Sequence, residues 1–255
     1  SRTDLINYAK KNNIPVPKDK KGAPPFSVDD NIFHTSTEGK VLENPKNSAP
    51  EFIFQRTVSP EKAPNKRTKV KITFKNGDPI AVNGKKLNPE KLLEKLNLLA
   101  GKNGIGRIDL VENRFVGIKS RGIYESPGIE LVGKAYEFLL QFILDRRARN
   151  LFDSLSMYLS EQIYQGYWFD LGSISAMKAI NNISQYVTGS VTMKLHKGSV
   201  LFSEVEEQLT SIPYSLYTDD SSMENLGDYD HADAEGFLKI LGVSAKNYGK
   251  KHPRN

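Results

Sequence analysis

The sequence lacks cysteine altogether among its 255 residues. Disulfide bonds and thiolate metal sites are therefore excluded, and a reducing compartment is compatible with this composition. The four histidines stand far apart and do not have the spacing of metal ligands. We expect no metal site from these residues: His34, His196, His231 and His252.

Long apolar runs are also missing. The longest apolar cluster, residues 135–144, is interrupted by Glu137 and Gln141. No window approaches the roughly 18 apolar residues that a membrane-spanning helix requires. The first residues do not have the basic, apolar and small regions of a signal peptide. We therefore expect no membrane partner.

Several common catalytic motifs are absent. The patterns GxxxxGK[ST], GxGxxG and GxSxG do not occur, which excludes the familiar phosphate-binding loops and the nucleophile elbow. The net charge of +6 and the pI of about 9.2 are compatible with a nucleic-acid partner. However, the basic residues are spread along the chain without a helix-turn-helix or RNP signature. A basic surface or pocket that attracts small anions explains the same charge.

The first half of the chain combines a proline-rich region with clearly patterned elements. Residues 3–12 have the pattern of a short amphipathic helix, and residues 15–67 that of a long loop region with short elements. Alternating apolar residues predict a strand over 69–75, which Asn76-Gly77 turns into a hairpin with residues 80–82. Asn88 and Pro89 predict a helix start. We expect this helix to bury an apolar stripe: Leu92, Leu93, Leu96 and Leu99.

The second half predicts a mixture of helices and hairpins. A strand is expected over 107–118, and residues 122–124 are expected to begin a turn. Helical patterns cover 130–165, with a break near 146–150, and 174–187. Residues 191–196 and 199–202 are expected to form a hairpin around Lys197-Gly198, and 219–233 an acidic loop. A terminal helix over 234–245 is expected to be interrupted at Gly236 and Gly242. Without regular βαβ alternation, this order predicts an α+β fold with mainly antiparallel sheet, helices and a C-terminal helical arm.

The segment 104–128 mixes charge and apolar residues more closely than any other part of the chain. Its sequence, GIGRIDLVENRFVGIKSRGIYESPG, places arginines and carboxylates among Ile, Leu, Val and Phe. Such charges are costly near a core unless they pair with each other or with a ligand. We interpret the segment as the floor of a polar pocket.

Glu112 and Tyr124 are the residues of this segment best suited to meet a ligand. In a strand, Glu112 and Arg114 point to one face and Asn113 to the other. The carboxylate can hold a ligand ammonium while nearby arginines keep it ionised, or it can belong to an internal ion pair. The Tyr124 hydroxyl can reach a polar ligand end.

Ser27 and Ser36 flank a second polar stretch, with Asp30 and His34 between them. Ser27 and Asp30 have the spacing of a helix cap, and spacing alone favours that interpretation. The alternative is a polar wall whose hydroxyls donate to and accept from a ligand. Two serines, one carboxylate and one tyrosine together suit a zwitterionic amino acid better than a nucleic acid or a lipid.

Several motifs of the chain resemble one known family. They are NIPVP at 13–17, FSVDDNIFHTS at 26–36, LENP at 42–45, the segment 104–128 and, more weakly, 185–200, 214–217 and 227–237. Together they resemble the C-terminal synthetase and multimerisation domain of argininosuccinate synthases. The resemblance covers nearly the whole chain and is weaker over 129–171 and 198–212.

The resemblance implies an enzyme activity for the family. Its members are ligases of arginine biosynthesis and the urea cycle, which join citrulline and aspartate with ATP, by way of a citrullyl-adenylate, and release AMP and pyrophosphate. By match of motif, the citrulline-binding residues are Ser27, Ser36, Glu112 and Tyr124. The resemblance assigns no catalytic residue to this chain. It also implies a cytoplasmic homotetramer, with Phe237, Leu238, Ile240 and Leu241 on an arm that reaches across subunits.

The family's nucleotide-binding domain, with its SGGxDTS loop, has no counterpart in this sequence. ATP, with Mg²⁺, and aspartate are bound mainly by that domain, so we expect this chain to be inactive alone. The expected organisation is a trailing end of the nucleotide domain at 1–12, a synthetase and multimerisation domain at 13–230 and a helical arm at 231–255. A basic nucleic-acid-binding module and a non-catalytic oligomerisation scaffold remain as alternatives.

Overall fold

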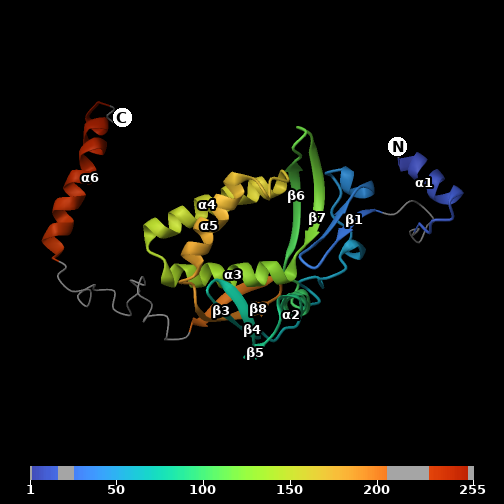
Figure 1. The fold of residues 1–255 in the computed structure, drawn as a ribbon, viewed down its shortest axis with the longest axis horizontal. Coiled ribbons are helices and arrows are strands. Elements are labelled where there is room, and N and C mark those ends of the chain that lie inside the picture. The colour runs from blue at the N-terminus through green and yellow to red at the C-terminus, as the bar shows by residue number, and fades with distance from the viewer. Residues whose placement is uncertain (1, 17–25, 206–229, 252–255) are drawn as a thin grey trace. The chain divides into compact units, whose positions relative to one another are not determined.

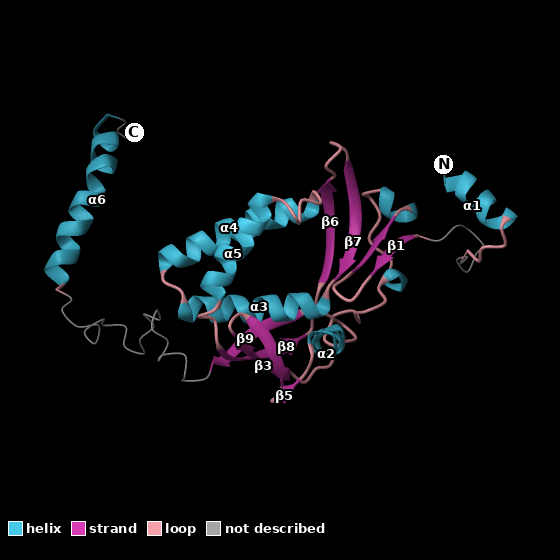
Figure 2. Ribbon diagram, viewed as in Figure 1, coloured by secondary structure: helices cyan, strands magenta, loops and turns pink. Residues whose placement is uncertain are grey.

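The computed structural model describes residues 2–16, 26–205 and 230–251. The chain divides into two compact units, Ser1–Ser215 and Leu216–Asn255. In the described part of the first unit, five helices and two antiparallel sheets occur (Figures 1 and 2). The helices are α1 Arg2–Lys11, α2 Pro89–Gly101, α3 Pro127–Ile143, α4 Arg146–Tyr164 and α5 Leu171–Ser184.

The smaller sheet has the strand order β1-β2-β7-β6 and is built from two hairpins. Its strands are β1 Ser27–Asp30, β2 Thr35–Glu38, β6 Arg107–Asn113 and β7 Lys119–Glu125. The β6–β7 turn closes where Gly117 N donates to Arg114 O (2.9 Å) and Arg114 N donates to Ile118 O (2.8 Å). Gly117 has a φ of +86°, a conformation that favours glycine. This turn therefore fixes which residues of β6 and β7 face each other.

The larger sheet has the order β5-β4-β3-β8-β9 and carries the main core. Its strands are β3 Thr68–Lys75, β4 Asp78–Val82, β5 Lys85–Lys86, β8 Gly189–His196 and β9 Ser199–Val205. Val70, Ile72 and Phe74 of β3 are buried, as their alternation with polar residues predicts. Both α2 and α3 pack over this sheet (Figure 2). The hairpins predicted around Asn76-Gly77 and Lys197-Gly198 are confirmed.

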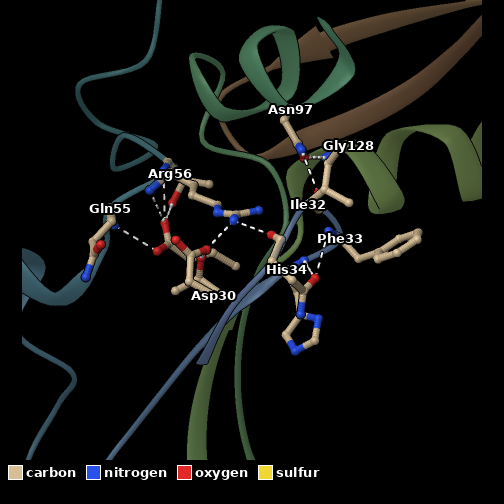
Figure 3. A network of polar contacts seen from close by, with 12 residues as sticks. Asp30, Ile32, Phe33, His34, Gln55, Arg56, Asn97 and Gly128 are labelled. Atoms are coloured by element: carbon tan, nitrogen blue, oxygen red, sulfur yellow. Dashed lines mark hydrogen bonds and ion pairs between the residues drawn. The ribbon is translucent and has the colours of Figure 1, made fainter. Parts of the chain in front are cut away.

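Helix α2 connects the two sheets through its side chains. The Asn88 side chain accepts from Lys91 N (2.9 Å) and caps the helix, as predicted. Asn97 donates to Ile32 O (2.9 Å) in the β1–β2 turn and accepts from Gly128 N (2.8 Å) at the start of α3 (Figure 3). One amide thereby holds the turn of the small sheet against the helices that cover the large one.

Helices α3 and α4 are separated at residues 144–145, just before the predicted break at 146–150, which instead forms the start of α4. Helix α3 ends at Ile143, and the Asp145 carboxylate caps α4 by accepting from Arg147 N (2.7 Å) and Ala148 N (3.1 Å). Helix α4 buries no residue completely and packs chiefly against α5. Among the described residues, no helix is both long and apolar enough to span a bilayer.

The described part of the second unit is helix α6, His231–Lys251. It runs without a break through Gly236 and Gly242, so the predicted interruption is wrong. Glycine in a helix interior costs only about 1 kcal/mol, and flanking residues with good helix propensity offset this cost. The apolar residues predicted for the arm are exposed in this chain: Phe237, Leu238, Ile240 and Leu241.

The α+β class with antiparallel sheets and a C-terminal helix is confirmed. Three further local predictions are wrong: the strand expected over 107–118 ends at Asn113, residues 122–124 lie inside strand β7, and Ser27 begins strand β1 instead of capping a helix. The last two segments are held by cross-strand pairing with residues distant in sequence, which local spacing does not reveal. The acidic loop predicted for 219–233 lies mostly outside the described residues.

Candidate functional site

The small sheet brings the predicted ligand-facing residues to one of its faces. Ser36 of β2 lies directly opposite Tyr124 of β7. Glu112 of β6 lies opposite Ser120, which is four residues from Tyr124 on the same strand. Residues opposite each other, and residues an even number apart along a strand, project to the same side. Ser36, Glu112 and Tyr124 therefore share a face, which we call the open face.

Ser27 joins this face through the edge strand β1. It pairs with Glu38, which is two residues from Ser36 on β2. Ser27 is exposed whereas Ser36 is buried. All four residues predicted from the sequence thus lie on one face of one sheet, and Glu38 lies on the same face. Glu38 was missed at the sequence level, although its spacing of two from Ser36 would have placed it on the same face.

Tyr124 and Glu112 are in direct contact. The tyrosine hydroxyl donates to Glu112 Oε2 at 2.7 Å. The tyrosine ring lies over Gly122 of the same strand. A Cβ added at residue 122 would be only 2.8 Å from Tyr124 Cε2. The ring of His34, in the β1–β2 turn, lies 6.0 Å from the tyrosine ring. Gly122 is therefore needed to let the phenol reach the carboxylate.

The surroundings of Tyr124 keep its hydroxyl protonated. Burial raises the pKa of Tyr124 well above its ordinary value, and the hydrogen bond to Glu112 raises it further. The charges of Glu112, Glu38 and Tyr164 act in the same direction. A phenol in this environment is a hydrogen-bond donor and not a base at neutral pH.

Arg114 lies between the two carboxylates of the open face. Its Nη2 donates to Glu38 Oε2 at 2.5 Å, and Ser120 Oγ donates to the same oxygen at 3.2 Å. Its Nε lies 3.9 Å from Glu112 Oε1, too far for a hydrogen bond. That Nε is buried and has no hydrogen-bond partner within the described residues. Glu112 is thus held on one oxygen by Tyr124 and only loosely on the other by Arg114.

The opposite face of the same hairpin carries charges that are fully engaged. Arg121 donates to both oxygens of Asp109, Nε at 2.8 Å and Nη2 at 2.7 Å. Its Nη1 also donates to Asn47 O at 2.9 Å. The hydrogen bond from Arg121 lowers the pKa of Asp109, and the bond to Asp109 raises the pKa of Arg121. We call this side of the sheet the closed face.

Glu125 is the most buried charge of the closed face. Its side chain is 2% exposed, and Thr57 donates to Oε1 through both N (2.9 Å) and Oγ1 (2.7 Å). Gln55 N and Arg56 N donate as well, at 2.8 and 3.0 Å. Arg107 then donates through Nε to Thr57 Oγ1 at 2.7 Å. This network fastens the proline-rich loop to the sheet.

The β1–β2 turn is fixed by a further set of polar contacts. Asp30 accepts from Thr35 Oγ1 at 2.7 Å and pairs with Arg56, which also donates to Asn31 O (Figure 3). The hydrogen bond from Thr35 is the largest cause that lowers the pKa of Asp30. The Asn31 side chain accepts from His34 N at 3.1 Å. The turn therefore holds His34 beside the tyrosine ring.

The open face is distinct from two hollows that flank helix α2. Each has a volume of about 630 Å³. One is lined by Arg56, Thr57, Asn97 and neighbouring residues, and the other mainly by apolar side chains of α2, α3 and β4. Neither is lined by Glu112 or Tyr124. In the described part of the chain, no group of three His, Cys, Asp or Glu side chains has the geometry of a metal site.

The sequence matches one family model, the argininosuccinate synthase C-terminal domain, over residues 26–248. The chain belongs to the argininosuccinate synthase family. It is 56% identical over 240 residues to the argininosuccinate synthase of Pelagibacter ubique (strain HTCC1062), which covers 94% of this chain and 60% of that relative. The argininosuccinate synthase of Mesorhizobium japonicum is 48% identical over 252 residues, covering 99% of this chain and 61% of the relative.

The argininosuccinate synthase of Xanthobacter autotrophicus (strain ATCC BAA-1158 / Py2) is 46% identical over 253 residues, covering 98% of this chain and 61% of the relative. The chain therefore spans about three fifths of the length of these relatives. The family resemblance carried by the sequence motifs is confirmed.

Proposed function

We propose that this chain supplies the citrulline-binding wall of an argininosuccinate synthase. The observation that carries the proposal is the open face, on which the four motif-matched residues gather although 97 positions separate Ser27 from Tyr124 in sequence. The complete enzyme joins citrulline and aspartate with ATP, by way of a citrullyl-adenylate, and releases AMP and pyrophosphate. Within that reaction, this chain contributes binding and orientation.

The chemistry of the open face suits the amino-acid end of citrulline. The free oxygen of Glu112 can accept a charge-assisted hydrogen bond from the ligand ammonium. Tyr124 fixes the other oxygen of that carboxylate, and the hydroxyls of Ser27 and Ser36 can donate or accept. A ligand held in this way presents its ureido oxygen in one orientation. The substrate then loses its translational and rotational freedom on binding, before the reaction step, and this lowers the barrier of that step.

The remaining substrates are assigned to a segment outside this chain. ATP, with Mg²⁺, and aspartate would bind mainly to a nucleotide domain that carries an SGGxDTS loop, and residues 1–12 would be the trailing end of that domain. No catalytic residue is proposed within this chain, which would be inactive alone. Residues 13–230 would form the synthetase and multimerisation domain, in a cytoplasmic enzyme.

The exposed apolar residues of α6 support a role in assembly. Phe237, Leu238, Ile240 and Leu241 are exposed in the isolated chain and would be covered by another subunit of a homotetramer. Light scattering of the chain should then give four times the monomer mass. A monomer at all concentrations would remove α6 from the assembly surface without affecting the citrulline proposal.

A reconstituted enzyme provides the functional test. The chain is joined to an upstream segment carrying the SGGxDTS loop and assayed for pyrophosphate with ATP, citrulline and aspartate. We expect pyrophosphate only when citrulline is present, and formation of AMP and argininosuccinate when aspartate is added. An intact, folded fusion that releases no pyrophosphate with citrulline would contradict the proposal. Salt-sensitive retention of RNA or DNA by the chain would instead support the nucleic-acid alternative.

A further inference from the structure

Two carboxylates of the open face lie beside one guanidinium. Glu38 comes from β2 and Glu112 from β6, and Arg114 in the β6–β7 turn contacts the first at 2.5 Å and approaches the second at 3.9 Å. The side chains of Glu38 and Glu112 are 27% and 24% exposed, and that of Arg114 is 40% exposed. Without Arg114, two partly buried carboxylates would face the ligand with no positive charge between them.

We infer that Arg114 is a positioning residue that offsets one negative charge of the open face and thereby sets its selectivity for an amino acid with a neutral side chain. This inference rests on the proposed citrulline site. Arg114 donates to Glu38 Oε2 through a short hydrogen bond and therefore offsets the charge of that carboxylate directly. Glu112 is only approached by the guanidinium, at 3.9 Å, and is the carboxylate less directly paired with it.

The hydroxyl groups that contact these two carboxylates add no charge to the face. Tyr124 donates to Glu112 as a neutral phenol, and Ser120 donates to Glu38 as a neutral hydroxyl. Asp109 and Arg121 belong to the closed face, where they neutralise each other. Asp29 of β1 lies opposite Ser36 and adds a third carboxylate at the exposed edge, so three negative charges and one positive charge lie on this face.

The charge balance matters because amino acids of similar length differ in net charge. Citrulline ends in a neutral ureido group and is a zwitterion with no net charge. Ornithine has the same backbone and chain length but ends in an ammonium and carries one extra positive charge. A more negative face would attract ornithine more strongly relative to citrulline, since selectivity is a difference between two affinities.

Three variants set the charge of the face to different values. Arg114→Gln makes the face more negative by one charge, Glu38→Gln makes it less negative by one charge, and the double variant restores the wild-type charge. Each is titrated as the full chain with citrulline and with ornithine by calorimetry at low ionic strength, where screening is weak. We expect the ratio of ornithine affinity to citrulline affinity to rise about tenfold in Arg114→Gln and to fall by a similar factor in Glu38→Gln. The double variant should return to the wild-type ratio.

A matched control removes a positive charge from the closed face of the same hairpin. Lys119 lies at the start of β7, where it donates to Asn113. Lys119→Gln should leave the ratio unchanged. Arg114→Lys keeps the charge and should keep the ratio near that of the wild type, even if the geometry of Glu38 is disturbed and both affinities fall.

The outcomes separate this inference from the proposed function. If the wild-type chain binds citrulline and the ratio is the same in Arg114→Gln, Glu38→Gln and the double variant, the inference is wrong and the citrulline site stands. If the wild-type chain binds neither amino acid, the proposed site itself is contradicted. Should Arg114→Gln fail to fold, Glu38→Gln and the double variant still decide, because the ratio is expected to fall in Glu38→Gln and to return to the wild-type value in the double variant.

Discussion

The two faces of the small sheet use the same residue types in different ways. On the closed face, Arg121 donates to both oxygens of Asp109 and to a backbone carbonyl. On the open face, Arg114 has a buried Nε without a hydrogen-bond partner in the described chain, and this atom lies 3.9 Å from Glu112 Oε1. One hairpin thus carries a completed polar network on one side and an incomplete one on the other.

The difference indicates what each face is for. A completed network fixes the loop that contributes Thr57 and Asn47, because no buried side-chain donor or acceptor on this face lacks a partner among the described residues. An incomplete network costs stability, and such costs are typical of sites that complete their contacts with a ligand. Substitutions on the closed face should therefore lower stability, and substitutions on the open face should lower ligand affinity.

The largest effect is expected from Glu125→Ala on the closed face. The substitution leaves the backbone N–H groups of Gln55, Arg56 and Thr57 without their common acceptor. We expect the free energy of unfolding to fall by about 3 kcal/mol or more. Urea denaturation followed by circular dichroism measures this change. A loss below about 0.5 kcal/mol would show that the closed face does not hold the loop.

An intermediate effect is expected from Gly122→Ala on the open face. The new Cβ would lie 2.8 Å from the ring of Tyr124, so the ring must move and its hydrogen bond to Glu112 is lost. We expect citrulline affinity to fall about fivefold, since one hydrogen bond contributes roughly 1 kcal/mol. Gly133→Ala in α3, where a Cβ meets no atom within 4 Å, is the matched control. Equal affinities in the two variants would argue against a role for the tyrosine.

The smallest effect is expected from acid titration of Asp109→Asn. Because Arg121 lowers the pKa of Asp109 in the folded chain, the ionised pair stabilises the fold above the unfolded value of 3.8. This contribution is lost as the pH falls through the lower, folded pKa. We expect Asp109→Asn to lower the free energy of unfolding at pH 7 by about 0.5 kcal/mol. Below pH 3.8, the free energies of unfolding of variant and wild type should become more similar. A difference that does not change with pH would contradict this assignment.

The fold could be predicted best where local chemistry decides it. The alternation of β3, the Asn76-Gly77 turn and the Asn88-Pro89 helix start are signals within a few residues of each other, and all three are confirmed. Strand β7 was partly misread because Gly122 indicated a turn. Its true role, which is to give the Tyr124 ring space, depends on the pairing of strands and cannot be read from local spacing.

In the candidate site, too, local spacing predicted some features and strand pairing decided the others. Alternation predicted that Glu112 and Arg114 share a face, and the contact between them on the open face agrees with this. The roles assigned to Ser27, Ser36, Glu112 and Tyr124 came from motif resemblance and stay predictions. Glu38 was missed because it is brought to Arg114 by the pairing of β2 with β7, across 76 positions of sequence.

The most direct test compares citrulline binding by Glu112→Gln and Asp109→Asn. Both substitutions remove one negative charge from strand β6, the first from the open face and the second from the closed face. Calorimetric titration should show citrulline affinity lowered by roughly 1.5–3 kcal/mol in Glu112→Gln, the contribution of a hydrogen bond to a charged group. Affinity should be unchanged in Asp109→Asn. Citrulline binding that is equally strong in both variants would contradict the assignment of the open face as the citrulline wall.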